Sequence, residues 1–390
     1  MELFEQITAS VSSFLWGWPM IILLLGTHIF LTIRLKFPQR KIFTAIRLSF
    51  KKDPDSEGDV SQFGALATSL AATIGTGNII GVATAVAFGG PGAVFWCWLT
   101  GVFGIATKYA EGLLAIKYRV KTSSGEMLGG PMYALERGLK QKWLGILFCI
   151  FTAMAAFGIG STVQANSIAL LMQETYGVSE HITGIVVALG IALVIFFGVK
   201  GIARGLFSNE SGLGSAPIVA AAAQTRNPVR QALVSSTGTF WDTVIICALT
   251  GLVLVTSVLA FPDIDYTQGG ALTKAAFGKI PYVGTSILAI GILTFAFSTI
   301  LGWGYYSGKA IEYLGGKKLL RIYRVIWISS IYFGSTMNLQ AVWNIADSVN
   351  ALMAVPNLIS LIFLSGVAVK ETQKYLWENR LEDTADPEDL

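Results

Sequence analysis

The sequence predicts an all-α polytopic membrane protein, and three observations support this prediction. First, 53% of the 390 residues are hydrophobic and only 13% are charged, whereas soluble domains carry roughly 25% charged residues. Second, the mean hydropathy is +0.61. Third, the apolar residues fall in long runs with most basic residues between them. Helices satisfy their own backbone groups in lipid, so such runs favour membrane-spanning helices.

Nine full spans are expected, because about 20 helical residues cross the hydrocarbon core. The first run is too long for a cleaved signal peptide and no basic stretch precedes it, so we expect it to remain as a span. A polar segment at about 205–223 adds a broken or re-entrant helix. In chain order, the nine apolar runs lie at 14–35, 62–88, 92–116, 143–172, 182–199, 232–260, 284–308, 324–345 and 348–369.

The distribution of lysine and arginine predicts a cell-membrane protein with its N-terminus outside. The first connection, 34–52, is strongly basic and is expected inside, whereas 173–181 carries no Lys or Arg and is expected outside. Residues 1–370 then form a single transmembrane domain, and 371–390 form a tail on the cytoplasmic side. The tail is rich in acidic residues, which predict a solvated, disordered end: Glu382, Asp383, Asp386, Glu388 and Asp389.

Several function classes are disfavoured by what the spans contain. The net charge of +4 is concentrated in loops, so it indicates membrane orientation and predicts no nucleic-acid partner. An enzyme needs an acid, base, nucleophile or metal set, which two isolated histidines and scattered carboxylates do not provide. A channel would show a continuous polar or acidic stripe, which the spans lack. We therefore expect a transporter, and not an enzyme.

Glycines and polar residues interrupt the span 62–88. The stretch Gly75-Thr76-Gly77-Asn78 is followed by Gly81. Each glycine costs about 1 kcal/mol of helix propensity relative to alanine, so the helix can break here and expose peptide groups to a ligand. Close packing of helices through small residues is the alternative interpretation.

The stretch from Gly205 to Pro217 is the second polar interruption. It holds an amide, a carboxylate and serines between glycines, which is expensive in hydrocarbon unless the segment lines a site. Its flanks carry Lys200 and Arg204 before it and Arg226 and Arg230 after it, so both flanks are predicted on one face of the membrane. Paired broken helices are typical of secondary-transporter sites, where half-helix N-termini hold a carboxylate and free carbonyls hold a cation.

Three stretches resemble the alanine or glycine:cation symporter family, also called the sodium:alanine symporters. They are Gly75 to Ala83, Arg204 to Pro217 and Phe297 to Gly308. The resemblance implies a leucine-transporter-type fold of two inverted five-helix repeats with extra peripheral helices, here about 62–204 and 205–370. It also implies symport of alanine or glycine with sodium, without a cofactor; a proton is the alternative coupling ion.

The resemblance further implies two sets of site residues. A substrate set would comprise Thr76, Gly77, Asn78, Gln164, Phe207, Gly212, Leu213 and Trp303. A sodium set would comprise the carbonyls of Ala71 and Ile74 with the hydroxyls of Ser298 and Thr299. For the two hydroxyls, back-bonding to their own helix is the alternative, and for Gln164 an interhelical packing bond.

Other polar residues inside the spans are assigned supporting roles. We expect Lys108 and Glu111 to snorkel toward the membrane interface. Asp242 could bind a proton, cap its helix or orient Arg230. Glu210 is expected to pair with Arg204, because a carboxylate beside the substrate carboxylate would repel it.

The chain departs from the family pattern around residues 204–205. There the basic end of the fifth span joins the second break directly, so by comparison with the family about one and a half passes, roughly 60 residues, are expected to be missing. The last helix of the first repeat and the first half of the second broken helix would be lost. We therefore expect impaired transport, and a non-transporting amino-acid-binding protein of the same fold is the alternative function.

Overall fold

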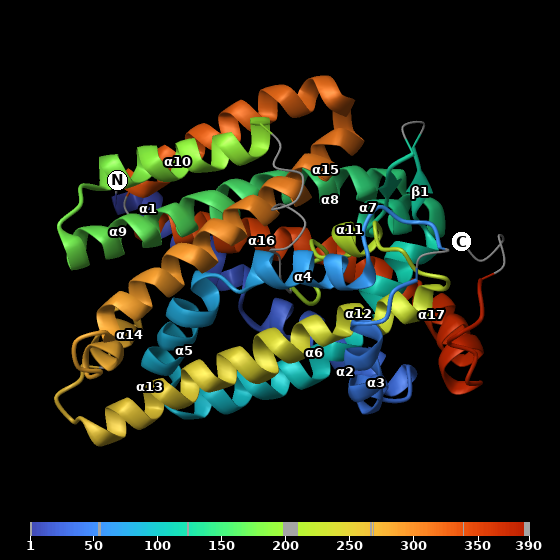
Figure 1. Cartoon of the computed structure of the whole chain (residues 1–390), viewed down its shortest axis with the longest axis horizontal. Helices are drawn as coiled ribbons and strands as arrows, with labels where there is room; N and C mark the ends of the chain where they lie inside the picture. The colour runs from blue at the N-terminus through green and yellow to red at the C-terminus, as the bar shows by residue number, and fades with distance from the viewer. Residues whose placement is uncertain are drawn as a thin grey trace.

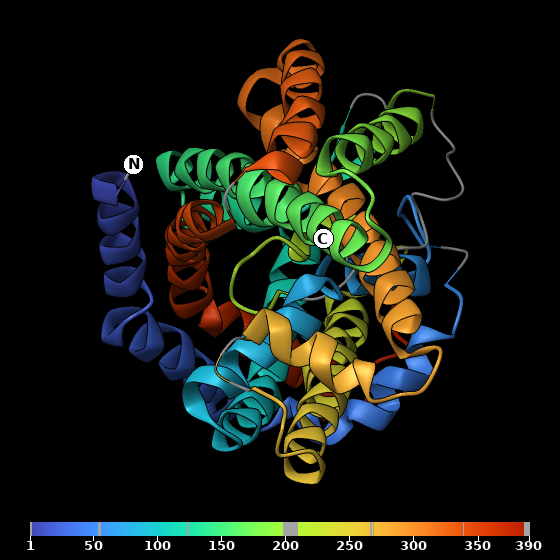
Figure 2. The same ribbon diagram turned by 90° about the vertical axis from the view of Figure 1, so that its left-hand side faces the viewer.

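A computed structural model of the chain describes residues 2–53, 56–122, 125–197, 210–265, 267, 269–337 and 339–385. It is a mostly helical bundle whose long helices run along its longest axis (Figure 1). Viewed from one end, the helices surround a packed centre and the N-terminal helix lies at the periphery (Figure 2). These features confirm the expected helical membrane protein.

The first part of the chain, up to residue 197, contributes helices and a small two-stranded hairpin. In order its elements are α1 (Glu2–Leu15), α2 (Trp18–Arg34), η1 (Pro38–Lys41), α3 (Ile42–Ser49), α4 (Gln62–Thr73), η2 (Gly77–Gly81), α5 (Val82–Gly89), α6 (Gly92–Lys117), β1 (Val120–Lys121), β2 (Met127–Leu128), α7 (Pro131–Tyr133), η3 (Ala134–Gly138), α8 (Lys142–Ala155), η4 (Ala156–Thr162), α9 (Val163–Tyr176) and α10 (Glu180–Phe197).

The second part, from residue 210, is helical in its regular structure. Its elements are α11 (Pro217–Ala220), α12 (Pro228–Thr239), η5 (Phe240–Cys247), α13 (Ala248–Ala260), α14 (Gly269–Gly278), α15 (Gly284–Thr336), α16 (Leu339–Phe363), α17 (Ser365–Thr372) and η6 (Gln373–Trp377). Several π-helical turns continue neighbouring α-helices, so α8, η4 and α9 form one continuous span, as do α12, η5 and α13.

Five helices within the described residues are long and apolar enough to cross a membrane, or six if a bent pair counts as one span. The bent pair is 62–73 with 77–89, at 57°, where the first break was predicted. The expected spans 92–116 and 182–199 correspond to α6 and the short apolar helix α10. The count of nine spans and the inverted repeats remain predictions.

The expected boundary between the last two spans is wrong. The run 284–308 and residues 324–336 of the next run form α15, which reverses direction at Gly316, between these two runs, and ends at Thr336. Gly316 has φ 68° and ψ −168°, a conformation that glycine adopts without steric cost. Figure 1 shows this reversal in orange at the upper right. The next helix starts by residue 339 instead of 348, so residues 339–345 of the expected span 324–345 belong to α16.

The core lies where distant helices pack together. α6 packs along α12, and α15 packs against α9 and α10. The largest fully buried side chains include Trp303 and Trp327 of α15. Helices α13 and α14 lie at one end of the bundle, and β1, α3, α17 and the C-terminus lie at the other (Figure 1). The two breaks described below lie between these ends.

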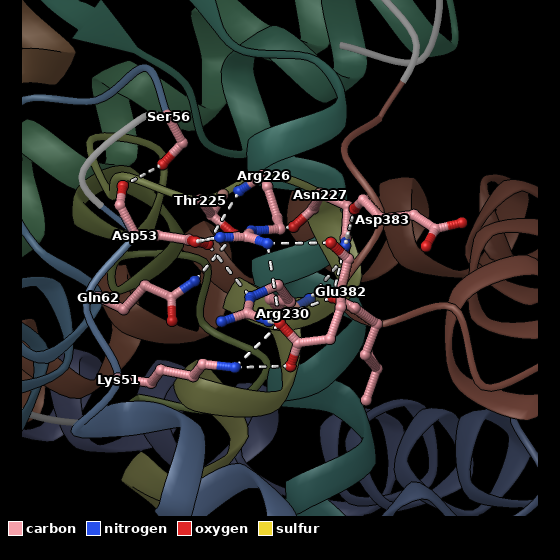
Figure 3. Close-up of polar contacts among 11 residues, drawn as sticks. Lys51, Asp53, Ser56, Gln62, Thr225, Arg226, Asn227, Arg230, Glu382 and Asp383 are labelled. Carbon is pink, nitrogen blue, oxygen red and sulfur yellow. Dashed lines mark hydrogen bonds and ion pairs between the residues drawn. The ribbon is translucent and has the colours of Figure 1, made fainter.

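The prediction of a disordered tail is wrong for its first part, because residues up to 385 are docked. The tail backbone accepts hydrogen bonds from Asn227 and Arg230 at the start of α12, and Ala385 donates one to Arg226. Glu382 of the tail forms ion pairs of 2.8 Å with Lys51 and 3.1 Å with Arg230 (Figure 3). Asp386, Glu388 and Asp389 lie outside the described residues.

A buried carboxylate anchors this docking surface. The side chain of Asp53 is 1% exposed and binds Arg226 at 2.5 Å and Arg230 at 3.2 Å. The Arg230 side chain is fully buried, so two arginines and two carboxylates compensate one another there (Figure 3). The hydrogen bond from Lys51, followed by the charge of Arg230, lowers the pKa of Glu382. We call Lys51, Asp53, Arg226, Arg230 and Glu382 the tail cluster.

Candidate functional site

The first break separates α4 from η2. Ile74 leaves the helix with φ −69° and ψ 80°, and the Gly75 amide turns back to the carbonyl of Thr73 at 2.7 Å. The Asn78 side chain closes the turn by accepting a hydrogen bond from the Gly75 amide at 3.1 Å. The Thr76 hydroxyl is buried and has no hydrogen-bond partner among the described residues. Such a group can serve a polar ligand.

Gln164 faces this break from α9. Its Oε1 accepts a hydrogen bond from the Thr76 amide at 3.3 Å, and its Nε2 donates to the Ile159 carbonyl at 3.1 Å. The structure therefore brings Gln164 together with Thr76, as the resemblance implies. The alternative role of Gln164, a packing hydrogen bond between helices, is also present, because its bond to the Thr76 amide joins α9 to the first break.

The four residues expected to hold sodium converge beside the first break. The Ser298 hydroxyl donates to the Ala71 carbonyl at 3.0 Å, and the Thr299 hydroxyl does so at 3.5 Å. Ser298 also donates to the Phe295 carbonyl of its own helix at 2.8 Å, so the back-bonding alternative is present as well. Hydroxyl and carbonyl oxygens are ligands that suit a hard cation.

An apolar groove of about 710 Å³ opens beside these oxygens. It lies between α4, α10 and α15, and it is lined by Ala71, Ile74 and Ser298 together with Val187 and Phe297. Three of the four expected sodium residues thus border a largely apolar space. Among the described residues, no group of three or more His, Cys, Asp or Glu side chains could hold a metal ion.

The second break is buried deep in the bundle. Residues 210–223 form turns and the single helical turn α11, and nearly every one of them is buried. Gly212 and Gly214 both have φ +89°, which L side chains rarely adopt. Leu213, between them, packs against both large hydrophobic clusters of the bundle. The expected substrate residue Phe207 and the junction at 204–205 lie outside the described residues.

Two helices hold the second break through their side chains. Glu111 of α6 accepts a hydrogen bond from the Gly212 amide at 2.9 Å, and Asn357 of α16 donates to the Gly212 carbonyl at 2.9 Å. Asn357 also donates to Glu111 at 2.7 Å. Lys108 lies 3.7 Å from Glu111, and both side chains are buried. The expectation that this pair snorkels is wrong, because the break supplies polar partners inside the bundle.

Asp242 is joined to the first break, not to Arg230. Its carboxylate accepts a hydrogen bond from the Asn78 amide at 2.7 Å. The interpretation that it orients Arg230 is wrong, since Arg230 binds Asp53 and Glu382 in the tail cluster. Glu210 accepts a hydrogen bond from Ser215, and its expected partner Arg204 lies outside the described residues.

Trp303 is fully buried in α15 and packs against the turn of η4. A Cβ added at Gly160 would lie 2.5 Å from the Trp303 Cβ, so the two backbones approach closely. Trp303 also belongs to the same buried cluster as Ile218 of the second break, and Leu213 packs against that cluster. Trp303 therefore lies between the second break and the helix that carries Gln164.

Sequence reasoning missed the roles of Glu111 and Asn357. Charges at i and i+3 in the middle of the α6 span were the available signal for Glu111. For Asn357, the signal was a Pro-Asn pair inside the apolar run of α16, where proline frees a backbone carbonyl. Gly77, another expected substrate residue, has open space beside it, because an added methyl there meets no described atom within 4 Å.

Comparisons with known proteins place these features in context. A family model described as the sodium:alanine symporter family matches residues 1–203 and 199–388. The sodium/alanine symporter AgcS of Methanococcus maripaludis is 47% identical, over 95% of this chain and 97% of the relative. Two Bacillus subtilis relatives are the amino-acid carrier protein AlsT, 33% identical over 95% and 92%, and the "Probable sodium/glutamine symporter GlnT", 32% identical over 96% and 91%.

The same comparisons bear on the internal junction. The alignment with AgcS is 440 positions long, 50 more than the 390 residues of the chain. At least that many positions of the relative therefore have no counterpart here. The two parts of the family match meet at 199–203, next to the junction expected to lack a segment.

Proposed function

The chain belongs to the sodium:alanine symporter family, and from this premise we propose that it binds a small neutral amino acid, alanine or glycine, together with sodium. Its relatives are amino-acid:cation symporters, so the function is transport and not catalysis. The observation that carries the narrower proposal is the first break, where the Thr76 hydroxyl is buried without a partner among the described residues and the Ser298 and Thr299 hydroxyls donate to the Ala71 carbonyl in the last turn of α4.

In this proposal, the residues expected from the sequence divide between the two ligands. Thr76, Gly77 and Gln164 would face the substrate from one side, and Leu213 and Trp303 from the other. A bound sodium ion would take the place of the hydrogens that Ser298 and Thr299 now direct at the Ala71 carbonyl. Partially positive helix N-termini at the breaks would favour the substrate carboxylate.

The proposal extends to a two-repeat, alternating-access cycle in the cell membrane, with the N-terminus outside and the C-terminus inside. Basic residues in the 34–52 connection support this orientation. Alternating access needs both repeats, and the alignment length supports a missing segment at the end of the first. We therefore expect binding to survive better than transport, with a non-transporting binding protein as the limiting case.

Two measurements on the purified full chain test the proposal. Titration calorimetry with alanine or glycine, with and without sodium, should show binding that requires sodium. Uptake into proteoliposomes driven by a sodium gradient should be weak beside that of AgcS prepared in parallel. Absence of sodium-dependent binding of either amino acid would refute the proposed function, and robust uptake would refute the proposed impairment.

A further inference from the structure

We propose that Glu111 and Asn357 are positioning residues that fix the peptide of Gly212 and thereby set the second break in its binding geometry. The inference rests on the proposed function for its effect on the amino acid, but its structural part stands independently. Neither side chain belongs to the substrate or sodium sets. Both act on the backbone of the break.

The first step is that Gly212 cannot rely on helical hydrogen bonds. Gly212 and Gly214 both have φ +89°, so the chain turns there and its peptide groups do not align as in a helix. Residues 210–223 are buried, and a buried peptide group without a partner is costly. The break therefore needs donors and acceptors from elsewhere in the bundle.

The second step is that Glu111 and Asn357 satisfy both groups of Gly212 in one closed arrangement. Glu111 Oε1 accepts from the Gly212 amide at 2.9 Å and from Asn357 Nδ2 at 2.7 Å. The same Nδ2 donates its other hydrogen to the Gly212 carbonyl at 2.9 Å. Hydrogen bonds to a charged group are roughly twice as strong as neutral ones, so the peptide is held firmly.

The third step concerns charge. Glu111 is 2% exposed, and an isolated carboxylate at such a position would be expensive. Lys108, one turn earlier on α6 and 1% exposed, places its ammonium 3.7 Å from Glu111 Oε2. This compensation lets a charged acceptor lie inside the bundle.

The first break shows a similar device, which argues against incidental packing. There Asn78 accepts from the Gly75 amide and donates to the Asp242 carboxylate at 2.7 Å. Each break is thus fixed by a side-chain amide bonded to a carboxylate from another helix. In the second break the fixed peptide adjoins Leu213, so its orientation sets where that side chain lies.

The test compares Asn357→Asp with a matched substitution elsewhere. Asn166 is also a buried amide whose Nδ2 donates to two carbonyls, those of Gly334 at 3.0 Å and Met337 at 2.9 Å. Asn166→Asp therefore controls for the general cost of this change. Hydrogen–deuterium exchange of the full chain in nanodiscs would be followed in the peptides covering 210–216 and 334–337.

We expect Asn357→Asp to speed exchange in 210–216 by about tenfold or more, the equivalent of one lost buried hydrogen bond to a charge. Asn166→Asp should speed exchange near 334–337 and leave 210–216 unchanged. If Asn357→Asp does not fold, Asn357→Ala removes the same two donated bonds without adding a charge. Unchanged exchange in 210–216 in a folded Asn357 variant overturns the proposal.

Alanine binding supplies the functional readout. Asn357→Asp should raise the alanine Kd about tenfold at saturating sodium, while the sodium concentration for half-maximal binding stays within about twofold, because the sodium set lies on the other break. A wild-type chain that binds neither alanine nor glycine refutes the proposed function, and the exchange experiment still decides the positioning. A Kd equal to the wild-type value, with faster exchange, overturns the functional part of the inference.

Discussion

At the scale of single residues, the fold requires the backbone at Gly160 to lie close to that at Trp303. A methyl group at this position would lie 2.5 Å from the Trp303 Cβ and 2.7 Å from its Cγ. Both partners belong to continuous helices, so neither can move freely. Any side chain larger than that of glycine therefore requires one of the two helices to shift.

We therefore predict that Gly160→Ala lowers the free energy of unfolding by about 1–3 kcal/mol through overpacking. Gly81→Ala is the matched control, since its added methyl meets no described atom within 4 Å and alanine favours helix. Thermal unfolding of both purified variants in detergent would measure the effect. Equal midpoints for the two variants would contradict the prediction.

The hydroxyl of Thr299 allows a second prediction at this scale. Thr299→Ala should raise the sodium concentration needed for half-maximal alanine binding by about tenfold, the effect of losing one cation ligand. Thr294→Ala is the control, because this hydroxyl bonds only to carbonyls of its own helix, at 2.7 and 3.1 Å. A tenfold change in both variants would show that the hydroxyl position is irrelevant.

At the scale of elements, the tail cluster joins three separate segments: the loop before α4, the start of α12 and the C-terminal segment. Its two carboxylates differ in burial, and this difference decides how much each contributes to stability. The Asp53 side chain is 1% exposed, whereas that of Glu382 is 59% exposed. A buried carboxylate compensating two arginines should matter far more than an exposed one.

We predict that Asp53→Asn lowers the free energy of unfolding by about 3 kcal/mol, because it leaves the buried guanidinium of Arg230 undercompensated. Glu382→Gln should cost about 1 kcal/mol or less. Denaturant unfolding of the two variants would rank them. The reverse order would show that the docked tail, and not the buried pair, stabilises this end of the bundle.

The pH dependence of Glu382 follows from its lowered pKa. A carboxylate whose folded-state pKa is depressed stabilises the protein above its unfolded pKa of about 4.3, and loses this contribution as pH falls through the folded value. The difference in stability between wild type and Glu382→Gln should thus be present at pH 7 and vanish in acid. Asp383→Asn is the control, since Asp383 pairs with Arg380 inside the tail itself. A difference that persists unchanged in acid would contradict this assignment.

Elements marked by a local pattern in the sequence could be predicted, whereas elements held by distant partners could not. Apolar length located α6 and the span from Lys142 to Tyr176 within a few residues. Basic residues also located the reversal at Gly316, which lies in the charged connection between the expected spans 284–308 and 324–345. The tail was missed, because its acidic composition predicts solvation, whereas its partners come from loops far away in the sequence.

Part of the candidate site could likewise be predicted from the sequence, and part could not. Glycines and hydroxyls marked both breaks, and the structure brings Gln164 to Thr76 and Ser298 to Ala71. Glu111 and Asn357 could not be paired from sequence, since 246 residues separate them and only the packing of α6 with α16 brings them together. Burial of a charge depends on partners that one sequence does not reveal.

At the scale of the whole molecule, the missing positions are the main difference from its relatives. In the family match they fall after α10 and before the second break. The groove of α4, α10 and α15 is a large apolar surface bordered by the middle of α10. An added span that leaves α10 could cover it.

We predict that inserting the corresponding AgcS segment between Arg204 and Gly205 raises sodium-driven alanine uptake by at least about tenfold, since it completes the first repeat. A segment of equal length with its apolar residues replaced by serine is the control, because it cannot cross the bilayer. Uptake into proteoliposomes would compare the three chains. An insertion that leaves uptake at the level of the unmodified chain would contradict the proposed cause of impairment.

If sodium binds at Ala71 and Ser298 as proposed, the groove makes the surrounding lipid part of the environment of the ion. Ala71 and Ser298, whose oxygens face each other, are also groove residues, so an acyl chain lying there would be a near neighbour of any ion they hold. Hydrocarbon screens charge poorly, and each ion–dipole interaction beside it is stronger than beside water. Chain length and saturation of the lipid would then change the affinity for the ion, because the bilayer would supply one wall of its site.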